Sequence, residues 1–294
     1  AQIAGDIQAV NESVKRLYQN VADRSVFLES INPYWSAPDY RNLFNSYIEY
    51  TLETANAMVS GDFTRNMELY DLLNELTNRM GDTFAEGVFD YITSGGLTEG
   101  TNANPSLNST PCLTREQIED IYILMTFWFE LIIWIRNYMV RVYTGTGDAE
   151  EALNRLLQVP VTYVTTLSRY FPDFDTDAYL DLFYTYIYLI RDFVNAMIEN
   201  NVDELNMATV ALYQNADDRA DFLSSVSPLW SRDELRDILY TNLRSTIEES
   251  SSFLAQDYEM NIDIFTRLLD QAENTGTLLA NGFFQHMAEN QPRR

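Results

Sequence analysis

The feature that most constrains the fold of this chain is an internal repeat. Residues 17–36 (LYQNVADRSVFLESINPYWS) and 212–231 (LYQNADDRADFLSSVSPLWS) are identical at twelve of twenty positions, at a constant offset of 195 and without a gap. The same offset continues further along the chain, where it pairs Asn66 with Asn261 and Gly87 with Gly282. Segments this similar are expected to fold alike, so we interpret 1–93 and 196–288 as copies of one module.

A fainter third copy lies between these two. Three stretches share a sixteen-residue spacing from a leucine to a proline: Leu17–Pro33, Leu156–Pro172 and Leu212–Pro228. Each proline is followed two residues later by a large aromatic residue and then by a residue that can cap a helix: Trp35-Ser36, Phe174-Asp175 and Trp230-Ser231. Proline cannot continue a helix, and Ser or Asp can cap the next one, so each stretch predicts a corner between two helices. The aromatic residue is expected to pack back on the turn that follows it.

The hydrophobic pattern is helical throughout and predicts an all-α fold. Apolar residues recur at intervals of three and four, and no run alternates as a strand would. We predict tandem helical bundles with about nine helices, built from duplicated helix-hairpin modules: 6–31, 37–60, 63–92, 114–143, 148–169, 176–200, 203–225, 232–256 and 258–287. Residues 1–93 then form a half module of three helices, 94–112 a linker rich in Gly, Ser, Thr, Asn and Pro, and 113–294 a complete six-helix module.

The charge balance excludes some classes of partner. The chain carries 44 acidic and 19 basic residues, a formal net charge of −25. Nucleic-acid binding needs a basic surface, so it is excluded, and an anionic membrane surface is disfavoured. The most apolar segment, 118–143, contains Glu130, Arg136 and Arg141, so we predict a central bundle helix and no membrane span.

Several catalytic residue types are scarce. The chain has one cysteine (Cys112), one histidine (His286) and one lysine (Lys15). A thiolate metal cluster, a Ser-His-Asp relay and a phosphate-binding lysine loop therefore have no candidates. We expect no enzyme activity, no cofactor and no resident metal.

Two groups of residues are candidates for a site. Glu130 lies among Trp128 and Trp134, with Arg136 and Arg191 as expected charge partners; we interpret it as a structural ion pair or, alternatively, as a ligand or metal pocket. The second group recurs in both copies and is interpreted as a structural hydrogen-bond node, with a hard-cation site as the alternative: Asn20, Asp23, Arg24, Asn215, Asp217, Asp218 and Arg219. The corner residues Pro33, Trp35, Pro228 and Trp230 are expected to be structural.

Four stretches together carry a resemblance to a known family: WFELIIWIRNYMV (128–140), RLLQ (155–158), LYQNADDRADFLSSVSPLW (212–230) and INPYW (31–35). They resemble a Firmicutes family of small helical proteins with a W-Y-x-N-A-D…F-L…N-P-x-W signature. The resemblance covers 113–290 as a full unit and 1–93 as a half unit. It implies a compact bundle of long helices and no settled biochemical activity. Histidines of the family pattern fall at Leu131, near Tyr186 or Thr185, and near Asn242, so a metal or proton-handling site built from them is lost here.

The half module motivates the functional hypothesis. Three helices without their partners leave an apolar face that must be covered, either by the full module of the same chain or by a neighbouring subunit. We therefore expect a non-enzymatic structural or self-assembling protein, a homo-oligomer or polymer, whose assembly divalent cations can assist. Small residues at the start fit removal of a signal peptide, so we expect an extracellular or cell-surface location, with the cytoplasm as the alternative. The alternative function is a binding module whose bundle core holds a small apolar or aromatic ligand or a divalent cation.

Overall fold

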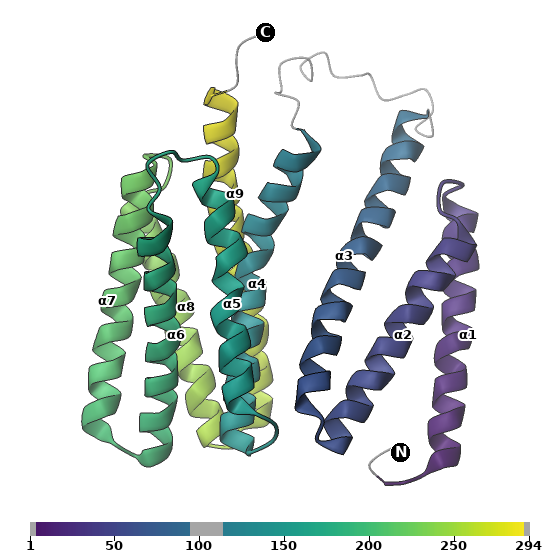
Figure 1. Cartoon of the computed structure of the whole chain (residues 1–294), viewed down its shortest axis with the longest axis horizontal. Helices are drawn as coiled ribbons and strands as arrows, with labels where there is room; N and C mark the ends of the chain where they lie inside the picture. Colours follow the sequence, from purple (N-terminus) through teal and green to yellow (C-terminus); the bar gives the residue numbers. More distant parts are fainter. Residues whose placement is uncertain (1–3, 95–113, 291–294) are drawn as a thin grey trace. The chain divides into compact units, whose positions relative to one another are not determined.

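The computed structural model describes residues 4–94 and 114–290, and within these ranges the chain forms nine α-helices and no strands (Figure 1). The prediction of an all-α fold is confirmed. The helices are α1 (Ile7–Ile31), α2 (Ala37–Ser60), α3 (Phe63–Thr93), α4 (Arg115–Thr144), α5 (Ala149–Ser168), α6 (Thr176–Glu199), α7 (Val202–Val226), α8 (Arg232–Leu254) and α9 (Tyr258–Asn290). No helix end differs by more than three residues from its predicted place. The predicted linker lies outside the described residues except for Ser94, and so does Cys112.

Short polar side chains fix where the helices begin. In each of α1 to α8 the residue before the first turn accepts a hydrogen bond from a backbone N–H of that turn: Asp6, Ser36, Asp62, Thr114, Asp148, Asp175, Asn201 and Ser231. Such a cap satisfies a donor that has no partner inside the helix. The helix boundaries are therefore set by local chemistry.

The chain divides into two compact units, Ala1–Ser109 and Thr110–Arg294. In the first unit α2 packs against both α1 and α3. Its buried cluster contains Val21, Tyr40 and Phe44, and Trp35 and Phe84 pack against that cluster. Three helices in a row thus share one small core.

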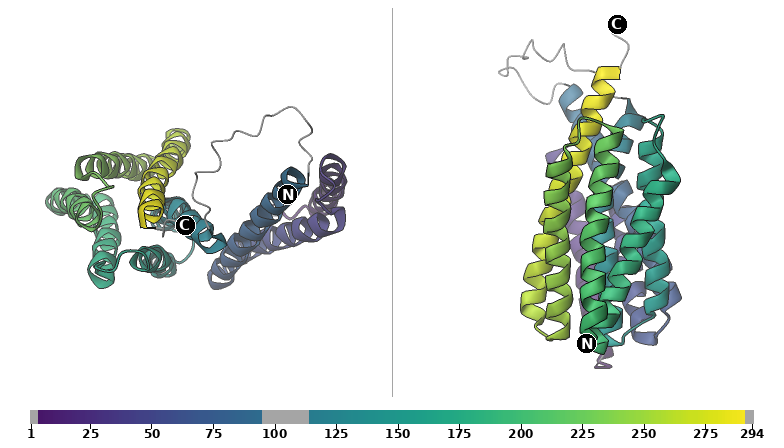
Figure 2. Two further views of the ribbon diagram at one scale, coloured as in Figure 1. Left: turned by 90° about the horizontal axis from the view of Figure 1, so that it is seen from above. Right: turned by 90° about the vertical axis from the view of Figure 1, so that its left-hand side faces the viewer.

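The second unit is a closed ring of six helices. Each helix from α4 to α9 packs against the next one, and α9 packs back against α4 (Figure 2). Neighbouring helices run antiparallel. The six-helix unit fully buries several large side chains: Trp134, Trp230, Tyr163, Tyr179, Phe183 and Phe283.

The aromatic residues at the helix corners reach across to another helix. The indole Nε1 of Trp230 donates to the backbone oxygen of Leu279 in α9 at 3.3 Å. At the same offset, Nε1 of Trp35 donates to the oxygen of Phe84 in α3, also at 3.3 Å. Trp35 also meets Tyr40 on the following turn, with ring centroids 6.2 Å apart. Each corner tryptophan therefore joins its corner to a further helix, α3 for Trp35 and α9 for Trp230. Trp35 also contacts the turn that follows it.

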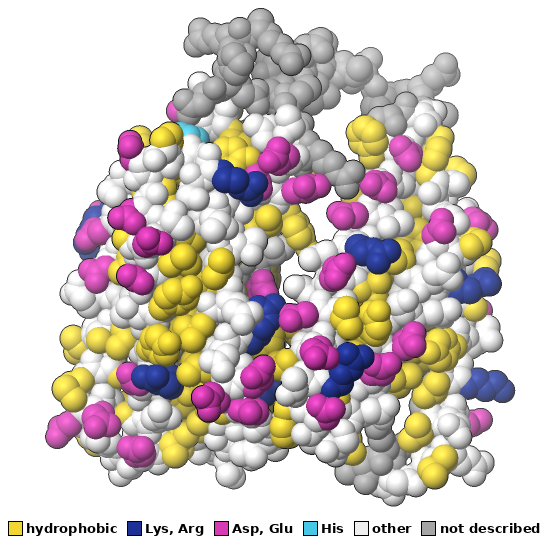
Figure 3. Space-filling view, viewed as in Figure 1, with side chains coloured by type: hydrophobic (Ala, Val, Ile, Leu, Met, Phe, Trp, Pro, Cys, Tyr) yellow, Lys and Arg dark blue, Asp and Glu magenta, His cyan; other side chains and the backbone are white. Residues whose placement is uncertain are grey.

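None of the helices in the described ranges has a stretch that is long and apolar enough to cross a lipid bilayer. α4, the most apolar by sequence, lies inside the six-helix ring, with Trp128, Leu131 and Trp134 buried. On the face seen in Figure 3 acidic side chains are dispersed over the surface and outnumber the basic ones.

Candidate functional site

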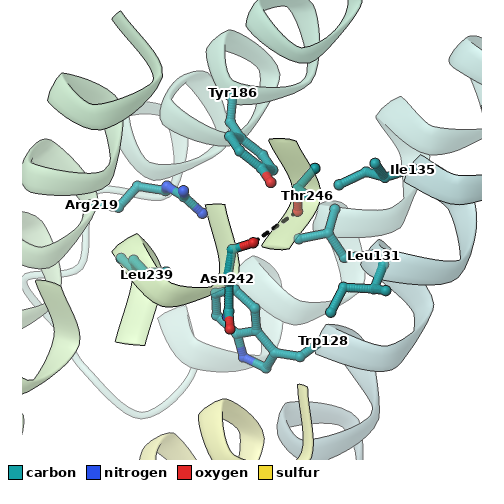
Figure 4. A pocket seen from close by; sticks show the side chains of 9 residues that line it. Trp128, Leu131, Ile135, Tyr186, Arg219, Leu239, Asn242 and Thr246 are labelled. Atoms are coloured by element: carbon teal, nitrogen blue, oxygen red, sulfur yellow. Dashed lines mark hydrogen bonds between the residues drawn. The ribbon is translucent and has the colours of Figure 1, made fainter. Parts of the chain in front are cut away.

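The six-helix unit encloses a small cavity between α4, α6, α7 and α8 (Figure 4). Its volume is about 20 Å³. The apolar part of its lining comes from Leu131, Ile132 and Ile135 of α4 and from Leu239 of α8. The cavity is therefore a local gap in an otherwise close-packed core.

Five further side chains form the polar part of the lining: Trp128 of α4, Tyr186 of α6, Arg219 of α7, and Asn242 and Thr246 of α8. Arg219 and Tyr186 extend toward the same central space from two different helices (Figure 4). Asn242 faces them from α8, and the hydroxyl of Thr246 donates to its backbone oxygen at 2.9 Å. Polar groups from four helices thus converge on one point.

Arg219 is the charged residue at this point. Its side chain is buried, with 3% of the residue exposed. Among the residues that the structure describes, no carboxylate forms an ion pair with it, and its Nε has no hydrogen-bond partner. The guanidinium carbon lies 4.4 Å from the ring centroid of Tyr186 and 5.5 Å from that of Phe183. Aromatic faces attract a cation, but they return only part of the hydration that a buried charge loses.

Burial lowers the pKa of Arg219, while the neighbouring Tyr186, Tyr179 and Tyr163 act in the opposite direction. An arginine stays protonated despite such a shift, because its ordinary pKa is above 12. The cavity therefore contains a permanent positive charge.

Two neutral groups on other residues that line the cavity also lack partners. Nε1 of Trp128 and Oδ1 of Asn242 are buried and have no hydrogen-bond partner within the described part of the chain. The amide nitrogen of Asn242 donates to Oγ1 of Thr275 in α9 at 3.0 Å. Leaving a buried polar group unpaired costs about 1–3 kcal/mol, so several at one cavity are unusual in a finished core.

A second buried charge lies further along α8. Glu249, 1% exposed, accepts a hydrogen bond from Arg136 of α4, whose guanidinium carbon lies 4.4 Å from the ring centroid of Phe265. Burial raises the pKa of Glu249 to about 6, and Arg136 limits the rise. This pair is a structural brace between α4 and α8 whose carboxylate titrates close to neutral pH.

The candidates around Glu130 are divided among several places. Glu130 forms an ion pair with Arg155 of α5 at 3.6 Å, a partner that the sequence did not indicate. Arg136 binds Glu249, and Arg191 pairs with its neighbour Asp192 at 2.7 Å. Trp134 is fully buried, with the guanidinium of Arg155 5.3 Å from its ring centroid. Of these predicted ligand-binding residues, Trp128 alone lines the core cavity.

The predicted polar node differs between the two units. In α7, Asn215 and Arg219 are buried, and the amide nitrogen of Asn215 donates to the oxygen of Leu182 at 2.9 Å. Asp218 is exposed and accepts from Gln214. Their counterparts in α1 are all exposed: Asn20, Asp23 and Arg24. Asn215 and Arg219 are thus part of the core in one unit, whereas their counterparts Asn20 and Arg24 lie on the surface of the other.

The positions at which the family resemblance places histidines meet at the cavity. Leu131, Tyr186 and Asn242 come from three helices and all line it. None of these side chains supplies an imidazole. Among the described residues, no group of three or more His, Cys, Asp or Glu side chains is arranged to hold a metal ion.

The chain was also compared with known proteins. No protein family, curated sequence or solved structure matches it.

Proposed function

We propose that this is a non-enzymatic assembly protein that pairs with a second copy of itself through α1–α3. The proposal rests on the surroundings of two glycines that are 195 residues apart, Gly81 and Gly276. Gly276 of α9 touches α4 so closely that an added Cβ would lie 2.6 Å from the backbone oxygen of Met125. Gly81, its counterpart in α3, would meet nothing within 4 Å. The α3 surface has the shape that receives a helix, and that position is open.

Side chains on the same face of α3 support this interpretation. Phe283 and Met287 of α9 are buried in the ring, at 0% and 4% exposed. Their counterparts in α3, Val88 and Ile92, are 43% and 50% exposed. Apolar residues that a neighbouring helix covers in α9 are therefore left on the surface of α3.

A second open face lies on α1. In the ring, α6 packs along α7 and covers Leu212, which is 0% exposed. Leu17, the matching residue of α1, is 41% exposed, and Phe27 and Ile31 of α1 are 61% and 52% exposed. Figure 3 shows apolar side chains at the surface of these helices. Exposed apolar side chains that gather on one face are typical of interaction sites.

Among the described helices, few are available to cover these faces. The faces of α1 and α3 match α7 and α9, so helices like α4–α6 would fit them. In each chain α4–α6 already close a ring with α7–α9. If they packed against a second chain instead, that ring would open. The partner that keeps all rings closed is α1–α3 of a second chain. A two-fold pair would place α1 of each chain against α3 of the other and close a six-helix ring of the same kind.

Light scattering coupled to size exclusion tests the proposal over a range of protein concentrations. We expect a dimer, and we expect Val88→Glu to convert it to a monomer, because a buried carboxylate without a partner is costly. Met207→Glu is the matched control: Met207 of α7 is 64% exposed, and the substitution adds the same charge outside the proposed face. Three results would contradict a two-fold pair: a parent protein that stays monomeric, growth into open-ended polymers, or a Val88→Glu variant that remains a dimer.

A second candidate is a binding module, which the core cavity favours. A cavity of about 20 Å³ is far smaller than the roughly 300–1,000 Å³ of pockets for drug-sized ligands. An aromatic ligand in the bundle core is therefore not supported, and neither is a divalent cation beside a positive Arg219. The occupant that remains is a single small species.

A further inference from the structure

The cavity at Arg219 combines four observations that belong together. A buried cation has no carboxylate partner among the described residues, a neighbouring indole N–H is unpaired, the walls are apolar, and a gap remains beside them. We propose that this cavity binds one small monovalent anion of chloride size, with Arg219 as its charge partner. This site is independent of the proposed pairing through α1–α3.

The first step of the argument is charge. Taking a cation out of water costs several kcal/mol unless an opposite charge or strong hydrogen bonds compensate it. Two acids lie near in sequence or along α8, and neither pairs with Arg219: one oxygen of Asp217 accepts from the hydroxyl of Tyr240 at 2.9 Å, and one oxygen of Glu249 binds Arg136. The aromatic faces of Tyr186 and Phe183 leave the N–H edges of the guanidinium open. An anion at those edges supplies the missing charge.

The second step is size and donor chemistry. A space of about 20 Å³ accommodates one water molecule or a halide, and it is too small for an aromatic acid. Arg219 lines this space and can donate N–H groups toward it, and Leu131 and Leu239 give the space apolar walls. Donors in an apolar wall select a weakly hydrated monovalent anion.

A single water molecule is the competing occupant. It could accept a hydrogen bond from Arg219 without neutralising the charge. The two occupants differ in one measurable respect, because only the anion makes stability depend on the identity of the dissolved salt.

The experiment measures thermal unfolding at constant ionic strength while sodium chloride or bromide replaces sodium gluconate. A ligand that binds only the folded state raises Tm, by about 5 °C when the free anion exceeds its Kd roughly a hundredfold. We expect this rise in the parent and its loss in Arg219→Met. Arg24→Met is the matched control, because Arg24 occupies the equivalent position in α1, is exposed, and carries the same charge; it should retain the rise.

A second readout covers the case in which Arg219→Met does not fold. Crystals of the parent protein grown in sodium bromide should show anomalous scattering from one bromide beside Arg219. Equal halide responses in the parent, Arg219→Met and Arg24→Met overturn the proposal. A bromide-free cavity that contains only water overturns it as well.

Discussion

The indole of Trp230 occupies the space that a side chain at position 282 would need. A Cβ added to Gly282 would lie 2.2 Å from Nε1 of Trp230, and Gly87 stands in the same relation to Trp35 at 2.0 Å. The absence of a side chain on the third helix lets the indole reach the helix backbone and donate to it. The corner and the third helix are therefore joined by one interlocked contact in each unit.

Trp230→Ala should destabilise the six-helix unit by about 3–5 kcal/mol, because it removes a buried ring and the hydrogen bond to Leu279. Calorimetry would show a large fall in the Tm of that unit. Trp35 is half-buried, so Trp35→Ala should cost less and should affect the transition of α1–α3. Unchanged Tm values in both variants, together with loss of self-association, would assign the tryptophans to a binding surface.

The two glycines of the α3 and α9 faces should respond to alanine with opposite signs. Gly276→Ala should destabilise the ring, because its Cβ would collide with the backbone of Met125. Gly81→Ala should raise the stability of α1–α3 by about 1 kcal/mol in dilute protein, since alanine favours a helix over glycine and nothing lies nearby. The same Gly81→Ala should weaken dimerisation, which sedimentation equilibrium can measure. An unchanged dimer affinity would argue against a helix docking at Gly81.

Glu249 should make the six-helix unit more stable as the pH falls from 7 to 4.5. Its pKa is about 6 in the folded protein against an ordinary value of 4.5, so the folded state binds the proton more tightly than the unfolded chain does. The gain builds up as the pH falls through about 6, amounts to about 2 kcal/mol, and is absent above that pH.

Chemical denaturation between pH 4.5 and 7 would test this gain against Glu249→Gln, which cannot titrate at this position. The variant should lose the part of the pH dependence that lies between about 4.5 and 6. Parallel stability curves for the two proteins would assign the pH dependence to the many surface carboxylates instead.

Self-association should strengthen with salt. Each chain carries a formal charge of −25, so two copies repel each other, and screening shortens the reach of that repulsion to about 10 Å at roughly 0.1 M salt. The dissociation constant of the dimer should therefore fall as sodium chloride or a divalent cation is added. Dissociation by added salt would show that ion pairs, and not apolar faces, hold the copies together.

The sequence predicts the helices far better than the site. Proline, serine and aspartate act within a few residues of where they stand, so the corners at Pro33, Pro172 and Pro228 could be located directly. The ion pairs could not: Glu130 meets Arg155 and Arg136 meets Glu249 because of how α4 packs against α5 and α8, and spacing within one helix carries no sign of that packing. A signal for Glu249 was present nonetheless, since it continues the buried stripe of Leu235, Leu239 and Leu243 along α8.

Arg219 shows the same limit in another way. The repeated motif places Arg219 in a predicted hydrogen-bond node, and its counterpart Arg24 carries the same local sequence signal. One is buried and the other is exposed, because only α7 is flanked by α6. Burial of the arginine depends on which helices surround the motif. The motif's own sequence does not indicate those helices.

The contact between α4 and α9 joins the two ends of the ring's sequence. Every other contact between neighbours in the ring joins helices that follow one another in sequence, and such local contacts form fast. The contact between α4 and α9 closes the longest loop, so its formation costs the most conformational entropy. We expect it to form last and to open first. Substitutions in this contact, such as Gly276→Ala, should then accelerate unfolding while leaving the refolding rate nearly unchanged. The contact between α4 and α9 would therefore determine the lifetime of the folded ring.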